Sequence, residues 1–144
     1  MKTVADILRN KGAQVTHVIG PDATVLEAIS LMADKGVGAL VVTEGEKVVG
    51  IVSERDYARK VVLMERSSYN TAVSEIMTSN VITVTPDFRH QSCMELMTEK
   101  RLRHLPVLQQ GRLIGLISIG DLVKEIMSAQ QAQINQLEQY IRGE

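Results

Sequence analysis

Two short segments of the chain carry the residues best suited to chemistry, and both follow one pattern. The first runs from Gly50 to Asp56 and the second from Gly115 to Asp121, at an offset of 115 − 50 = 65 residues. In each, a glycine and two apolar residues precede a serine, and an aspartate follows three positions later. An ionised aspartate only accepts hydrogen bonds, so it can bind a vicinal diol, and free N–H groups at a helix start favour an anion. The pattern predicts a sugar-phosphate site where a strand passes into a helix.

The elements that position these segments are also duplicated. Everything from Pro21 to Asp56 recurs 65 residues later without a gap. Hydrophobic periodicity, turn residues and caps predict the same series in each copy: a short helix, a strand, a longer helix, a β-hairpin and a helix that begins at the motif serine. The expected ranges are helix 4–11, strand 15–19, helix 25–35, hairpin 38–42 with 47–52 and helix 53–64, then helix 73–77, strand 81–84, a helix containing 93–97, and hairpin 104–108 with 112–117.

The last part of the chain lies beyond the duplication. Apolar residues continue at helical spacing after Asp121 and, from Ile134 to Ile141, adopt a heptad-like spacing of three and then four. We therefore expect repeat 1 over 1–68, repeat 2 over 69–127 and a helical tail over 128–144. The tail either folds back on its own domain or packs on a second chain, and the second reading is favoured because the tail has no counterpart in the first copy.

Bulk composition excludes several classes of protein. The 144 residues carry a net charge of −1, with 3% aromatic residues and one cysteine, Cys93. The chain therefore lacks the excess positive charge that binds nucleic-acid phosphates and the aromatic residues on which bases stack. No apolar run approaches the ~20 residues of a membrane span, and a signal peptide is not visible. The three histidines lack ligand spacing, so no metal is expected. We expect a cytoplasmic protein that binds neither membrane nor nucleic acid.

The duplicated motifs, the Pro-Asp turns at 21–22 and 86–87, and the strand segments Gly38–Val42 and His104–Val107 together resemble the CBS domain pair, or Bateman module. The resemblance covers nearly the whole chain apart from the tail. It implies an α/β (α+β) fold in which two tandem repeats pack as a pseudo-twofold pair. It also implies a regulatory binding module without catalytic activity, which senses an adenosine nucleotide and signals by changing its conformation or dimer packing.

The resemblance further implies two clefts, each built from both repeats, that bind AMP, ADP, ATP or NAD, with S-adenosylmethionine less expected. One cleft is predicted to combine Thr16, His17, Gly38 and Ala39 with Ser118, Ile119, Gly120 and Asp121. The other is predicted to combine Val81, Arg103 and His104 with Ser53, Glu54, Arg55 and Asp56. We also expect a homodimer and a protein partner of unknown identity.

The two motifs differ in charge, so the clefts are not expected to be equivalent. The first contains Glu54 and Arg55, where the second has Ile119 and Gly120. Guanidinium groups of Arg55 and Arg103 can form bidentate bonds with phosphate. We expect the cleft that contains them to prefer the more phosphorylated ligand.

Two other readings of the same residues stay open. Each Ser-x-x-Asp can be a capping box that only stabilises a helix start, although this role is compatible with ligand binding. The protein can also be a dimerising structural adaptor with vestigial clefts. Ile119 and Gly120 in the second motif support this reading. An enzyme is not expected, because no nucleophile with a positioned base and no Walker-type loop is visible.

Overall fold

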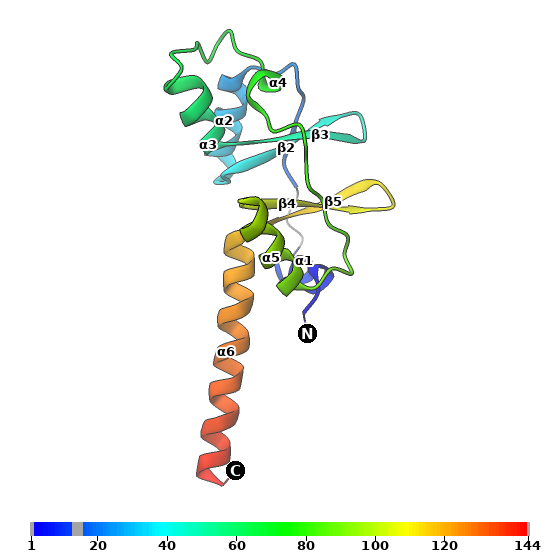
Figure 1. The fold of residues 1–144 in the computed structure, drawn as a ribbon, viewed down its shortest axis with the longest axis vertical. Coiled ribbons are helices and arrows are strands. Elements are labelled where there is room, and N and C mark those ends of the chain that lie inside the picture. The colour runs from blue at the N-terminus through cyan, green and yellow to red at the C-terminus, as the bar shows by residue number, and fades with distance from the viewer. Residues whose placement is uncertain (1, 13–15, 144) are drawn as a thin grey trace.

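The computed structural model describes residues 2–12 and 16–143 and shows two similar halves, one above the other, with a long helix leading away from them (Figure 1). The predicted residue Val15 lies outside the described part. The elements are α1 (Val4–Asn10), β1 (Val18–Ile19), α2 (Val25–Lys35), β2 (Ala39–Glu44), β3 (Lys47–Ser53), α3 (Glu54–Tyr57), the π-helix η1 (Ala58–Val62), α4 (Val73–Ile76), α5 (His90–Lys100), β4 (His104–Gln109), β5 (Arg112–Ser118) and α6 (Ile119–Arg142).

Capping residues begin the helices where the sequence predicts. Thr3, Thr24, Ser53 and Ser118 each accept a hydrogen bond from the backbone N–H three residues later, and the acidic side chain at that position bonds back to the cap. Such reciprocal boxes satisfy donors that a helix start otherwise leaves free. The predicted helix 53–64 forms in part, as α3 followed by a single π-helical segment that ends at Val62.

The sheets of the two halves differ by one strand. In the first half β1 pairs in parallel with β2, and β2 pairs antiparallel with β3. In the second half β4 pairs with β5, and the predicted strand 81–84 was wrong: only Val84 bridges to Val107. Pro106 stands 65 residues after Val41, whose N–H bonds to the carbonyl of His17. Proline has no N–H to donate, so this ladder bond cannot form in the second half.

The two hydrophobic cores exchange a helix. Val4 and Ile7 of α1 pack with residues of the second repeat, whereas Val73 and Ile76 of α4 pack with residues of the first. The rest of the second core is Val84, Cys93, Met97, Leu105, Val107, Ile117 and Leu122, and the rest of the first is Val25, Ala28, Met32, Leu40, Val42, Val52 and Val61. Although 1–68 was predicted to be one repeat, the helix at its start completes the core of the other.

The first glycine of each motif makes room for the exchanged helix. A Cβ atom on Gly115 would lie 2.6 Å from the side chain of Leu8, and one on Gly50 would lie 2.5 Å from the sulfur of Met77. Leu8 of α1 and Met77, which directly follows α4, stand in the same register, because 77 − 8 and 73 − 4 both equal 69. The motif glycines therefore allow the exchanged helices to pack closely on β3 and β5.

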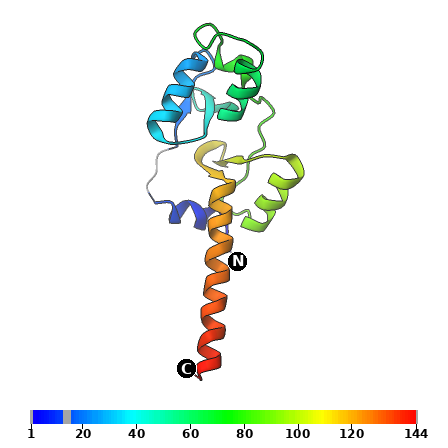
Figure 2. The same ribbon diagram turned by 90° about the vertical axis from the view of Figure 1, so that its left-hand side faces the viewer.

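The last helix is one continuous element rather than a repeat helix with a separate tail. α6 spans 24 residues from Ile119 to Arg142 and contacts the body only through its first turns, where Leu122 and Glu125 are buried. Figures 1 and 2 show the remainder standing clear of the body from both directions. The reading in which the tail folds back on its own domain was therefore wrong. No helix among the described residues has the length and apolar character needed to cross a bilayer.

Candidate functional site

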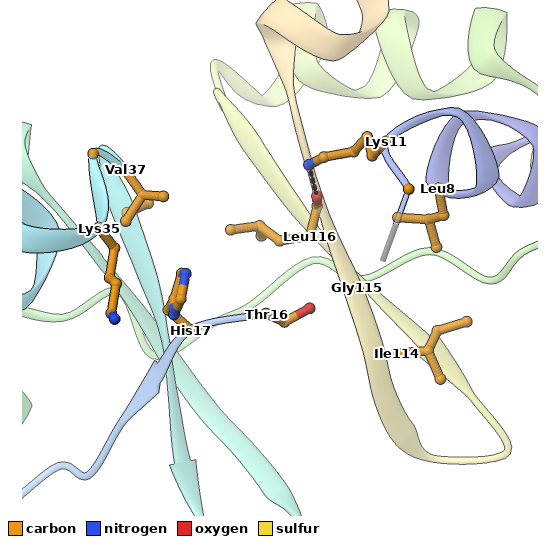
Figure 3. A pocket seen from close by; sticks show the side chains of 12 residues that line it. Leu8, Lys11, Thr16, His17, Lys35, Val37, Ile114, Gly115 and Leu116 are labelled. Carbon is orange, nitrogen blue, oxygen red and sulfur yellow. Dashed lines mark hydrogen bonds between the residues drawn. The ribbon is translucent and has the colours of Figure 1, made fainter. Parts of the chain in front are cut away.

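A cavity of about 530 Å³ lies between the two halves, in the ~300–1,000 Å³ range of small-molecule sites. The segment around β1 and the end of α2 form one wall, and β5 with the end of α1 form the other (Figure 3). The lining residues are Leu8, Lys11, Gly12, Thr16, His17, Lys35, Gly36, Val37, Ala39, Ile114, Gly115 and Leu116. Residues from both repeats thus enclose one space.

The charge in this cavity has one sign. Lys11 and Lys35 line it from opposite walls, His17 lies between them, and no acidic residue is among the described residues that line it (Figure 3). The side chains of Leu8, Val37 and Ile114 add an apolar surface. Each ammonium group also has a carboxylate partner, Asp121 for Lys11 at 3.0 Å and Asp34 for Lys35 at 3.6 Å, so an anionic ligand would compete with these carboxylates for the two lysines.

Lys11 connects this cavity to the second motif. Its Nζ donates to the carbonyl of Leu116 at 2.9 Å and to Asp121 Oδ2 at 3.0 Å. Asp121 Oδ2 also accepts from the backbone N–H of Ser118 at 2.8 Å. Burial by itself would raise the pKa of Asp121, but the bonds from Ser118 and Lys11 outweigh it and hold that pKa below 3.8. Asp121 is therefore ionised at neutral pH, as an acceptor for a ribose diol must be.

The first motif has a matching arrangement with a different lysine. Asp56 Oδ2 accepts from the backbone N–H of Ser53 at 2.9 Å and from its hydroxyl at 3.1 Å. Lys60 Nζ lies 3.3 Å from Asp56 Oδ1 and donates to the carbonyl of Ile76 at 2.8 Å. Each motif aspartate is thus held by its own cap and by a lysine that also bonds a backbone carbonyl. The capping-box reading is confirmed for both motifs, and it leaves a ligand role open.

Three arginines meet at the mouth of the first motif. Repulsion from Arg59, and next from Arg103, lowers the pKa of the exposed Arg55 below its ordinary value. Arg103 belongs to the second repeat, so the halves bring like charges together here. Guanidinium groups that repel one another favour a polyanion between them.

His104 lies at the edge of the second motif. It is half-buried and pairs across the hairpin with Ser118. Burial lowers its pKa below 6.5, Asp121 acts in the opposite direction, and Lys11 and Arg103 add to the lowering. The imidazole is therefore mostly neutral at pH 7 and can accept as well as donate a hydrogen bond.

The predicted site residues fall into recognisable places. Thr16, His17 and Ala39 line the main cavity, with Gly38 next to them. Ser118, Ile119, Gly120 and Asp121 form the start of α6, and Lys11 links Asp121 to the cavity; Ser53, Glu54, Arg55 and Asp56 form the start of α3, near Arg103. Val81 lines a separate cavity of about 510 Å³ with Lys47 and Thr83, and neither Arg103 nor His104 is among the described residues that line it.

The hairpins also place each strand start beside the motif of its own repeat. Ala39 pairs with Ser53, and the carbonyl of Gly38 accepts from Glu54 N; His104 pairs with Ser118. The combination of residues from opposite repeats in each cleft stays a prediction.

Lys11 and Lys35 were not predicted as site residues. The sequence holds no local signal for the contact of Lys11 with Asp121, because 110 residues separate them.

The fold and the cleft define a duplicated two-sheet module whose halves complete each other. The chain belongs to the CBS domain family, whose pattern matches residues 4–63 and 73–128. The mitochondrial CBS domain-containing protein CBSX3 of Arabidopsis thaliana is 38% identical over 149 residues, covering 98% of this chain and 72% of that protein.

Solved structures agree with this assignment. A protein with CBS domains from Burkholderia ambifaria MC40-6 superposes with a TM-score of 0.84 at 55% identity, covering 90% of this chain and 96% of that one. The CBS domain pair of MJ0100, solved with 5′-methylthioadenosine and S-adenosyl-L-methionine, has a TM-score of 0.79 at 23% identity, covering 90% of this chain and 98% of that one. At that identity the second comparison shows the fold alone.

Proposed function

We propose that this protein is a regulatory CBS pair that binds an adenosine nucleotide between its repeats and signals to a partner protein. The observation that carries the proposal is the cavity shared by both repeats, with Lys11 joining it to Asp121. A ligand in such a place contacts both halves at once. It can therefore favour one arrangement of the halves over another, which is what regulation by a ligand requires.

The chemistry of the lining favours a phosphate-bearing ligand. In this proposal the base lies against the backbone near Gly38 and Ala39, the ribose diol bonds to Asp121, and Lys11 and Lys35 bind the phosphates. MJ0100 shows that the same fold can hold adenosine derivatives. The cations in our cavity make AMP, ADP, ATP or NAD better candidates than the cationic S-adenosylmethionine. No residue in this scheme requires a metal.

Asp121 also gives the ligand a route to the rest of the molecule. It is the third residue of α6, and its carboxylate closes the capping box at the start of that helix. A ribose that recruits Asp121, or a phosphate that draws Lys11 away, changes the first turn of α6 directly. We propose that the protein acts as a cytoplasmic homodimer without catalytic activity, nucleic acid or membrane, and that this helix takes part in signalling.

Thermal unfolding with each ligand tests the proposal. At a hundredfold excess over Kd, a ligand that binds only the folded state adds ~2.7 kcal/mol of stability. For a chain of 144 residues this corresponds to a rise in Tm of roughly 5–10 °C. We expect a rise with at least one of AMP, ADP, ATP and NAD, and a smaller one with S-adenosylmethionine. No rise with any of them at millimolar concentration would count against nucleotide sensing.

A structural adaptor is the second candidate, and one observation favours it. Both motif aspartates already accept hydrogen bonds in a capping box and form an ion pair with a lysine. If the clefts are vestigial, Asp56→Asn together with Asp121→Asn leaves partner binding unchanged and nucleotides have no effect on it. If the first proposal holds, the double variant loses the response to nucleotide while it still folds.

A further inference from the structure

Among the described residues, the outer part of α6 packs on no other element of its own chain. Every described residue from 127 to 143 is exposed, although the segment contains five large apolar side chains. Figures 1 and 2 show this part of the helix free on all sides. A solitary helix of this length is marginal in water, because most helical stability in proteins comes from packing of an apolar face.

Five of the seven exposed large apolar residues of α6 lie along one face, and the other two are Ile119 and Tyr140. We define the α6 stripe as Val123, Met127, Ile134, Leu137 and Ile141, of which Ile134 is 48% exposed and Ile141 is 81% exposed. At 3.6 residues per turn these side chains share one face, with Gln130 filling the remaining position. Leu122 and Glu125, which pack on the body, point to a different face. The stripe thus passes the body without being covered by it.

The spacing of the stripe matches a two-stranded coiled coil. Met127, Ile134 and Ile141 occupy the a positions of a heptad, and Val123 and Leu137 occupy d positions. Isoleucine at a with leucine at d favours two helices. From Val123 to Ile141 the stripe is about 27 Å long at ~1.5 Å per residue, so it offers almost three heptads.

The charges beside the stripe select its occupant. Between Lys124 and Arg142 the only charged side chain that faces solvent is Glu138. A helix that lies on anionic lipid carries lysines and arginines on its polar face, and a nucleic acid also needs cations; this helix offers glutamines instead. A second copy meets no like charge in either orientation. In the antiparallel one, Lys124 lies beside Glu138 of the partner subunit.

We propose that the α6 stripe is covered by the α6 stripe of a second copy of this chain, in a two-stranded coiled coil. An isologous contact of this kind uses the same patch on both subunits and closes without further growth. It would place the helix that starts at Asp121 in direct contact with its counterpart. This inference rests on the homodimer of the proposed function, but not on any ligand.

The test compares two full-length double variants with equal changes in charge. Ile134→Glu with Leu137→Glu places two carboxylates in the stripe, and Gln136→Glu with Gln139→Glu places two on the opposite face. Light scattering after size exclusion, over a hundredfold concentration range, gives the dissociation constant of the dimer. We expect the first variant to raise it at least a hundredfold and the second to change it less than threefold.

Folding of the body is checked independently, because both pairs lie outside the two cores. The Tm measured by near-ultraviolet circular dichroism at low, monomeric concentration should be the same for wild type and both variants. A wild-type chain that stays monomeric at about 100 μM, or a stripe variant that dimerises as tightly as wild type, would overturn the inference. Neither result bears on nucleotide binding, which is measured by the ligand-dependent Tm.

Discussion

Lys11 and Asp121 lie 110 residues apart in the chain and 3.0 Å apart in the structure. The ammonium group also bonds the carbonyl of Leu116, so it ties the end of α1 to β5 and to the first turn of α6. Both side chains are mostly shielded from solvent, with exposed fractions of 27% and 17%. This ion pair occupies the carboxylate that a ribose would need, and a bound phosphate would compete for the same lysine.

Replacing Lys11 by Met separates these two effects. We expect Lys11→Met to weaken binding of ATP at least tenfold, because a charge-assisted bond to phosphate contributes about 1.5–3 kcal/mol. Adenosine, which has no phosphate, should bind equally or more tightly, since Asp121 is released. Calorimetric titration of both ligands measures the difference, with Lys100→Met as the control at the exposed end of α5. Equal losses for both ligands would contradict the role given to Lys11.

Arg55 is expected to act on phosphates at the other motif. It has Arg59 and Arg103 as neighbours and is exposed. Arg55→Ala should weaken binding of ATP about tenfold and that of adenosine much less, in line with the strength of charge-assisted bonds. The exposed Arg112→Ala is a matched control. A loss of affinity of the same size for adenosine would show that Arg55 does not bind the phosphates.

The two motif glycines should differ in their tolerance of a methyl group. In Gly115→Ala the three atoms nearest to the new Cβ all belong to the flexible Leu8 side chain, whereas in Gly50→Ala they include the carbonyl oxygen of Thr78 at 3.0 Å as well as Met77. Overpacking of a core costs about 1–3 kcal/mol, so both variants should lose stability, and Gly50→Ala should lose more. Chemical denaturation measures the free energy of unfolding.

A control and a rescue accompany the glycine variants. Gly20→Ala adds a methyl group where no atom lies within 4 Å, so it should change stability by less than about 0.5 kcal/mol. Leu8→Ala combined with Gly115→Ala should be less destabilised than the sum of the single variants, because the two residues contact each other. Additive losses would mean that Gly115 is required for another reason.

His104 should make stability depend on pH. Its folded pKa lies below 6.5, so the unfolded chain binds more protons as the pH falls through 6.5. The free energy of unfolding should therefore decrease as the pH is lowered past 6.5 and level off below the folded pKa. His104→Asn should flatten this part of the profile. An unchanged profile in His104→Asn would show that another group causes the pH dependence of the free energy of unfolding.

Local sequence signals predicted most elements, and their failures have identifiable causes. Thr24 and Gly36 bound α2 as expected, because caps act over three or four residues. The strand 81–84 failed through a residue outside it, Pro106, which removes a ladder donor from the neighbouring strand. The exchange of α1 and α4 was also missed, since a repeat in sequence does not say which copy of a core a helix completes. The contact of Lys11 with Asp121 depends on that exchange.

The exchange of α1 and α4 bears on how such a chain could arise. A single ancestral copy could not finish its own core, because the helix that precedes its sheet packs on the other half. Two separate copies would each need that helix from the other, as in a domain-swapped dimer. In a tandem chain the same exchange takes place within one molecule. Two peptides divided near residues 66–70 should therefore restore the fold only when they are mixed.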